Sequence, residues 1–245
     1  MNRWTVGPGL VAATLLAALA GLLGCGDREV PAAEFGERLF QDPAVSTSRL
    51  NRFACATCHR VAPSGPPVII GSYDSGYNLA GVAGRPSWWG GGATSLLAAI
   101  NVCLEEFMGG RALRPEDDAA RQLGAYLAEQ TPPEPQPAAL FTIVRVVTPL
   151  EGISGDPSKG GVIYTGGCLR CHGAAHSGAG RLDATFSIVP EDTQRAFPAP
   201  GEARFAVVEK LRHGRFFNIG GVMPLYSLEA LSDRDVVDLL AYLGL

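Results

Sequence analysis

The sequence has no run of basic residues, and its overall balance of charge is acidic. Its 245 residues include 20 Lys and Arg against 24 Asp and Glu, a formal net charge of −4. A nucleic-acid-binding surface needs clustered cations that neutralise a row of phosphates, so we expect no nucleic-acid partner. The hydrophobic share of 47% is too high for a disordered chain and suits one or two globular domains.

Residues 1–24 have almost no charge. Arg3 is the single charged side chain there, and the apolar stretch VGPGLVAATLLAALAGLLG follows it. This pattern is typical of an export signal peptide. The stretch ends in LLGC, which resembles a bacterial lipobox, and that resemblance implies cleavage before Cys25 and lipidation of its thiol. An uncleaved membrane helix is the alternative, because the length is marginal for spanning a bilayer. Either way we expect an exported chain on the periplasmic side of a bacterial membrane, tethered to it.

The number of cysteines does not suit a framework of disulfide bonds. Without Cys25, five of the 6 cysteines remain, and five cannot all pair. Four of them lie in two copies of Cys-x-x-Cys-His, in FACATCHR and CLRCH. The copies comprise Cys55, Cys58 and His59, and Cys168, Cys171 and His172. This is the attachment pattern for c-type haem, in which two thiols bond to the porphyrin and the histidine binds the iron. The sequence therefore predicts two covalently bound haems.

Two other interpretations of the motifs explain less. One structural zinc ion bound by the four motif cysteines would leave both adjacent histidines without a role. A thioredoxin-type redox pair belongs after a strand in a βαβ setting, which neither motif has.

The sequence repeats itself around the two motifs. His59 lies 49 positions before Met108, and His172 lies 51 positions before Met223. Each methionine is followed by an AYL triplet, and each motif is preceded by a glycine and an apolar-aromatic pair, in GERLF (36–40) and GGVIY (160–164). An internal repeat of this kind indicates two copies of one structural unit.

Each half resembles a class I cytochrome c domain. The resemblance implies a mainly α fold with two tandem class I cytochrome c domains, 33–130 and 141–245, joined by a proline-rich linker at 131–140. It also implies that the first and last helices of each half cross closely, with Gly36 against Tyr126 and Gly160 against Tyr242.

Two terminal helices are expected on local grounds as well. In LSDRDVVDLLAYL, Ser232 is the expected N-cap with Asp235 three residues on, a variant of the capping box. The apolar stripe is Val236, Leu239, Leu240 and Leu243. In RPEDDAARQLGAYLAEQ, Pro115 and the acids after it predict the start of a helix.

Each half offers a candidate for the second axial iron ligand. Met223, in GGVMPLY, is close to the Met-Pro loop that supplies this ligand in class I cytochromes c. Met108 has the matching spacing in the first half, and a thioether ligand favours an electron carrier. Cys103 is the alternative there, because CLEEFMGG is similar to the segment of thiosulfate dehydrogenase-like dihaem cytochromes that presents an axial cysteine. The chain lacks the arginine that precedes that cysteine.

Two tryptophans, an arginine and two histidines outside the motifs are further candidates for a role at the haems or in the fold. Trp88 and Trp89 are expected to wall a haem pocket or stack at the domain boundary, or alternatively to form a docking patch for a partner. Arg85 is a candidate partner for a haem propionate. His176 is expected in a solvated loop, and His213 at a helix end where it supports the last carbonyls.

We therefore expect a membrane-tethered dihaem cytochrome c that carries single electrons between redox proteins through weak contacts. The alternative is a haem oxidoreductase that acts on a sulfur compound or on peroxide at the first haem. A peroxidase of that kind commonly has a distal histidine, and no histidine lies between His59 and His172.

Overall fold

The structure is a computed structural model, and it describes residues 30–63, 65–130, 139–214 and 223–245. These parts of the chain are helical and contain no β-strand, as the predicted mainly α fold requires. The α-helices are α1 (Ala32–Gln41), α2 (Cys55–Cys58), α3 (Leu96–Val102), α4 (Asp118–Glu129), α5 (Pro157–Gly167), α6 (Leu169–His172), α7 (Glu191–Ala196), α8 (Glu202–His213) and α9 (Asp233–Tyr242). The shorter turns are the 3-10 helices η1 (Pro43–Val45), η2 (Val82–Gly84) and η3 (Trp89–Gly91), and the π-helical turn η4 (Cys103–Phe107).

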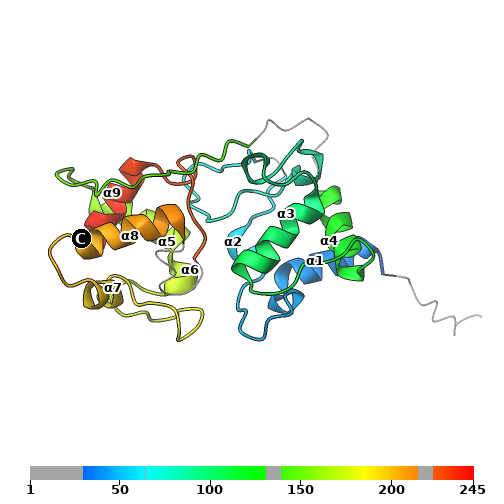
Figure 1. Ribbon diagram of the computed structural model, residues 1–245, viewed down its shortest axis with the longest axis horizontal. Helices are drawn as coiled ribbons and strands as arrows, with labels where there is room; N and C mark the ends of the chain where they lie inside the picture. Colours follow the sequence, from blue (N-terminus) through cyan, green and yellow to red (C-terminus); the bar gives the residue numbers. More distant parts are fainter. Residues whose placement is uncertain (1–29, 64, 131–138, 215–222) are drawn as a thin grey trace, which may run out of the picture. The chain divides into compact units, whose positions relative to one another are not determined.

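Helices α1 and α4 pack against each other around one hydrophobic cluster (Figure 1). Each helix buries residues at helical spacing, which are Ala33, Gly36 and Phe40 on α1 and Ala120, Leu123 and Leu127 on α4. A Cβ built on Gly36 would overlap the backbone carbonyl of Gln122 and lie 2.7 Å from Cβ of Tyr126. Glycine is therefore required at the crossing point, as predicted.

Helices α5 and α9 repeat this arrangement around a second cluster. A Cβ built on Gly160 would overlap the carbonyl of Asp238 and lie 2.6 Å from Cβ of Tyr242. The predicted contact between Gly160 and Tyr242 is confirmed. Because the same glycine-tyrosine contact occurs in both halves, the repeat seen in the sequence is also a repeat in three dimensions.

The local expectations for the terminal helices are confirmed at α9 and need a correction at α4. Ser232 caps α9, and Asp235 completes the capping box. The predicted stripe of α9 is fully buried. Helix α4, however, begins at Asp118, after an N-cap at Asp117, and Pro115 lies in the preceding turn. The reason is that the Asp117 carboxylate accepts a hydrogen bond from the Arg114 backbone N–H, which holds residues 114–117 in a turn.

Residues Ala32–Leu245 form one compact unit. The predicted export segment, the lipidation site Cys25 and most of the linker at 131–140 lie outside the described residues. Within the described ranges, no helix combines the length and the apolar character needed to cross a membrane.

Candidate functional site

The first motif opens onto a cavity of about 430 Å³. Its lining includes Cys55, Cys58 and His59 of the motif together with Cys103 and Met108, the two candidates for the second ligand. All five residues predicted for the first haem thus meet in one space. The volume lies within the range of cofactor pockets, and most of the other lining side chains are apolar.

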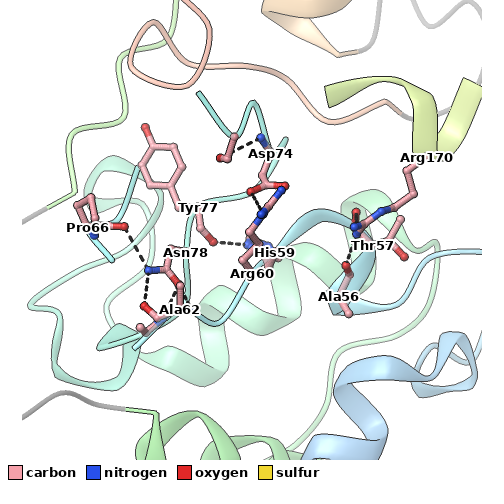
Figure 2. A network of polar contacts seen from close by, with 12 residues as sticks. Ala56, Thr57, His59, Arg60, Ala62, Pro66, Asp74, Tyr77, Asn78 and Arg170 are labelled. Atoms are coloured by element: carbon pink, nitrogen blue, oxygen red, sulfur yellow. Dashed lines mark hydrogen bonds and ion pairs between the residues drawn. The ribbon is translucent and has the colours of Figure 1, made fainter. Parts of the chain in front are cut away.

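The imidazole of His59 is held in one orientation by the backbone (Figure 2). Its Nδ1 lies 2.8 Å from the carbonyl oxygen of Tyr77. Gly76 lies so close to the ring that a side chain would not fit there. A Cβ at that position would lie 2.5 Å from Nδ1 and 2.9 Å from the Cys58 carbonyl oxygen. A histidine that donates from one ring nitrogen to a carbonyl has its tautomer fixed, and the other nitrogen is left for a metal. Burial also lowers the pKa of His59, which favours the neutral form that binds iron.

The second motif repeats this geometry. Nδ1 of His172 lies 2.9 Å from the carbonyl oxygen of Ser187, and burial lowers the pKa of this imidazole too. The ring of Phe186 meets the His172 ring edge-on, with centroids 6.4 Å apart. No described residue forms a hydrogen bond with Nε2 of His59 or of His172. Both imidazoles therefore have the arrangement of a proximal iron ligand.

A π-helical turn presents the two candidates for the second ligand at the first haem. The N–H of Met108 donates to the carbonyl of Cys103 across η4, at 3.1 Å. Such turns occur frequently at functional sites. Met108 is buried, and its carbonyl accepts a hydrogen bond from Ser46. Burial raises the pKa of the Cys103 thiol to about 12, so in the protein alone this thiol is neutral. A bound metal ion would itself displace the thiol proton, so both residues remain candidates.

Arg85 supplies a buried positive charge to the same cavity. Its side chain donates to the carbonyls of Asn78 and Ala80, yet its Nε is buried with no partner among the described residues. Burial lowers the pKa of this guanidinium. A buried cation with an unused N–H calls for an anionic partner, and a carboxylate of a haem meets that need. The residues around the cavity therefore fit a haem.

Aromatic side chains close the cavity, as one of the two interpretations of the tryptophans predicts. Trp88 and Trp89 both line it, and their indole N–H groups donate to the carbonyls of Val82 and Ala99. Trp89 stacks on Phe107 and meets Phe141 edge-on. These contacts account for both tryptophans without a docking partner.

The structure brings fewer of the second-site residues together. Cys168 and Met223 pack against the same hydrophobic cluster. The loop before Met223 lies outside the described residues, and Met223 remains a predicted ligand of the second haem. No group of three or more Cys, His, Asp or Glu side chains in the described residues is arranged to bind a metal ion, so the zinc interpretation has no site there.

Two histidines outside the motifs make structural contacts. His176 lies exposed in a loop, as expected, and pairs with Glu191 at 2.7 Å. His213 ends α8 as expected, but it does not support that helix's last carbonyls. Instead Nδ1 pairs with Glu209 and Nε2 with the carbonyl of Val144, because the chain before α5 passes close to this helix end.

Sequence reasoning missed the groups that orient the motifs. The carbonyl of Tyr77 and the close contact with Gly76 hold the imidazole of His59, and the carbonyl of Ser187 holds that of His172. A carbonyl is present at every residue, so the sequence carries no signal for which one a histidine uses. Gly76 follows Ser75 in an otherwise ordinary loop, and nothing in its neighbours distinguishes it.

Comparison with known proteins bears mainly on the second half. Residues 155–243 match the family model described as cytochrome c oxidase, cbb3-type, subunit III. No curated protein matches the chain. A solved structure of thiosulfate dehydrogenase (TsdBA) from Marichromatium purpuratum, in its as-isolated form, is 18% identical, with a TM-score of 0.39. The match covers 87% of this chain and 45% of that one, and a likeness of this size carries no functional argument. Residues 155–243 thus carry a cytochrome c domain, and such a domain implies covalently bound c-type haem and electron transfer.

Proposed function

We propose that the chain is a membrane-tethered dihaem c-type cytochrome that carries single electrons between redox proteins at the cell envelope. The observation that carries the proposal is the repeated proximal geometry. In each half a motif histidine turns Nδ1 to a backbone carbonyl, at 2.8 Å for His59 and 2.9 Å for His172. A dihaem chain requires two cofactor sites, and the same histidine arrangement in both halves supports two such sites. The tether rests on the LLGC sequence that ends at Cys25.

A bound haem supplies an iron ion that alternates between Fe(III) and Fe(II). The residues of the chain then have three tasks. The thiols of each motif hold the porphyrin covalently, and the histidines orient toward the iron with a fixed tautomer. At the first site, Leu104, Leu123 and the tryptophans exclude water, which lets the protein set the potential. Arg85 provides the positive charge that compensates the anionic edge of the group.

A redox titration of the matured, purified protein, followed by optical and magnetic spectra, tests this function. We expect two low-spin haems that each take up one electron reversibly. Reduction by a small periplasmic electron donor without turnover of thiosulfate or peroxide would support the carrier. A protein that lacks two titrating haems would contradict it.

The second candidate is an oxidoreductase that acts on a sulfur compound at the first haem. It is favoured by one observation, that Cys103 lines the same cavity as His59. Peroxide chemistry has less support, because His59 is the only histidine among the described residues that line this cavity. Comparing Cys103→Ala with Met108→Ala separates the possibilities. If Met108 is the ligand, Cys103→Ala leaves the spectrum of the first haem unchanged and Met108→Ala alters it; the reverse pattern indicates a thiolate-ligated site.

A further inference from the structure

The two motifs touch each other through one arginine (Figure 2). Arg170 occupies the second variable position of Cys168-x-x-Cys171. Its Nη1 donates to the carbonyl oxygens of Ala56, at 2.6 Å, and Thr57, at 2.9 Å. Those two residues are the variable positions of the first motif. The arginine of one motif therefore binds the backbone of the other, between the two cysteines of the first motif.

The acceptors explain why a cation is favoured there. Ala56 and Thr57 belong to α2, which ends at Cys58, and the last carbonyls of a helix lack partners within it. A guanidinium at this end satisfies two of them and is attracted by their partial negative charge. Without Arg170 these carbonyls would depend on solvent, and the short α2 turn would lose its link to α6.

The contact joins the residues that come directly before the second cysteine of each motif. Arg170 precedes Cys171, and Thr57, whose carbonyl oxygen accepts its hydrogen bond, precedes Cys58. We call this contact between the two motifs the junction of Cys58 and Cys171. Both cysteines are predicted attachment points of a haem.

Other contacts continue the junction. The ring of Phe53, which lines the first cavity, meets Phe186 edge-on, with centroids 5.6 Å apart. Phe186 in turn packs against the His172 ring. Pro224, the residue after Met223, also lines the first cavity. Residues near the two motifs are therefore in direct contact with each other.

We propose that electrons pass between the two haems across the junction of Cys58 and Cys171, and that Arg170 is the positioning residue that holds this junction and raises the potential of both haems. The inference rests on the proposed dihaem function. In each passage one iron goes from Fe(II) to Fe(III) and the other from Fe(III) to Fe(II), with no proton or further reactant. A positive charge beside both cofactors favours the form with the extra electron, so its removal lowers both potentials.

The test compares Arg170→Ala with a matched control, Arg52→Ala, in the matured full-length protein. Arg52 is also an exposed arginine and also joins the two halves, through an ion pair with Asp183 at 2.8 Å. Both variants lose one positive charge and one contact between the halves, but only Arg170 contacts a motif. The readouts are the potential of each haem, the rate at which an injected electron equilibrates between them, and their magnetic interaction in electron paramagnetic resonance.

For Arg170→Ala we expect slower equilibration, a weaker magnetic interaction and lower potentials. At a fixed solution potential, the Fe(II)/Fe(III) ratio of each haem falls by about two- to fivefold, the effect of one exposed charge, and the fall shrinks as salt is added. Arg52→Ala remains like the wild type. Wild-type potentials and rates in Arg170→Ala, or equal effects in both variants, would overturn the inference while leaving the dihaem function intact.

Arg170→Lys keeps the test decisive if Arg170→Ala fails to mature. Lysine retains the charge but lacks the guanidinium that reaches both carbonyls. We expect near-wild-type potentials with a slower equilibration, and an unchanged rate would contradict the positioning role. Failure of the proposed function looks different, because the wild-type protein itself would then lack two titrating haems.

Discussion

At the scale of single residues, the histidine of each motif is oriented by a backbone carbonyl rather than by another side chain. Nδ1 of His59 pairs with the Tyr77 carbonyl, and Gly76 lies close against its ring; Nδ1 of His172 pairs with the Ser187 carbonyl. The histidine supplies the ligand, whereas the backbone decides where the ligand points. Small changes in the loop should therefore affect the iron site as strongly as changes in the motif.

Gly76→Ala is expected to damage the first site selectively. The added methyl group would collide with the His59 ring and with the Cys58 carbonyl, and overpacking of this kind costs about 1–3 kcal/mol of unfolding free energy. We expect an altered spectrum for the first haem and an unchanged spectrum for the second, which serves as the internal control. Two unchanged spectra would show that the Gly76 contact does not position His59.

Arg85→Gln tests the buried charge in the cavity. Loss of a buried cation that lines the cavity should lower the potential of the first haem, because a nearby positive charge favours Fe(II) over Fe(III). Arg121→Gln is the control, because Arg121 is exposed on α4 and pairs with Asp118. Spectroelectrochemical titration measures both variants, and an equal shift in the two would argue against a role for Arg85 at the cofactor.

At the scale of helices, the fold depends on two crossings that each require a glycine. Gly36 lets α1 approach α4, and Gly160 lets α5 approach α9. In both pairs the glycine faces a carbonyl and the Cβ of a tyrosine. The crossing positions the start of each half relative to its end and so holds the hydrophobic cluster that borders each motif.

Alanine at either crossing is expected to destabilise the protein. Gly36→Ala and Gly160→Ala should each lower the free energy of unfolding by about 1–3 kcal/mol or more, because the contact is with backbone that cannot move aside. Gly124→Ala is the matched control on α4, where no atom lies within 4 Å of the added methyl group. There we expect a gain of about 0.5–1 kcal/mol from helix propensity. Chemical denaturation measures all three, and a stable Gly36→Ala would contradict the crossing.

The periodic burial of the helices and the position of the tryptophans at the cavity were predictable from sequence, whereas the groups that orient the motif histidines were not. Periodic burial and the Ser232 cap are local patterns, which one sequence displays directly, whereas the glycine-tyrosine contacts are what the resemblance to class I cytochrome c domains implies. The bound carbonyls, the π-helical turn at Cys103–Phe107 and the contact of Arg170 with Ala56 depend on chain segments that meet only after folding. Helix α4 begins after Pro115 because the Asp117 carboxylate accepts a hydrogen bond from the Arg114 N–H and holds residues 114–117 in a turn.

At the scale of the whole molecule, the segment at 139–142 connects the first cavity to the helical core around α9. The Tyr77 hydroxyl donates to the Leu140 carbonyl, and Phe141 packs edge-on against the rings of Tyr77 and Trp89. Thr142 donates to the carboxylate of Glu229 through both its backbone N–H and its hydroxyl. This carboxylate anchors the segment that covers the cavity.

Glu229→Gln is expected to destabilise the protein at neutral pH by about 1 kcal/mol, because solvent screens this partly exposed carboxylate. Although burial acts in the opposite direction, hydrogen bonds from Thr142 lower the pKa of Glu229 to about 2, below its ordinary value of 4.5. Its stabilising contribution is therefore complete above pH 4.5 and disappears as the pH falls toward 2. Unfolding free energies measured across this range should converge for variant and wild type, and a constant gap would contradict the assignment.

The central claim is that both Cys-x-x-Cys-His motifs carry a covalently attached haem. The most direct test is the mass of the matured protein, measured beside Cys55→Ala/Cys58→Ala and Cys168→Ala/Cys171→Ala. We expect two added haem groups in the wild type and one in each double variant. A wild-type protein with one haem or none, or a double variant that still carries two, would contradict the account.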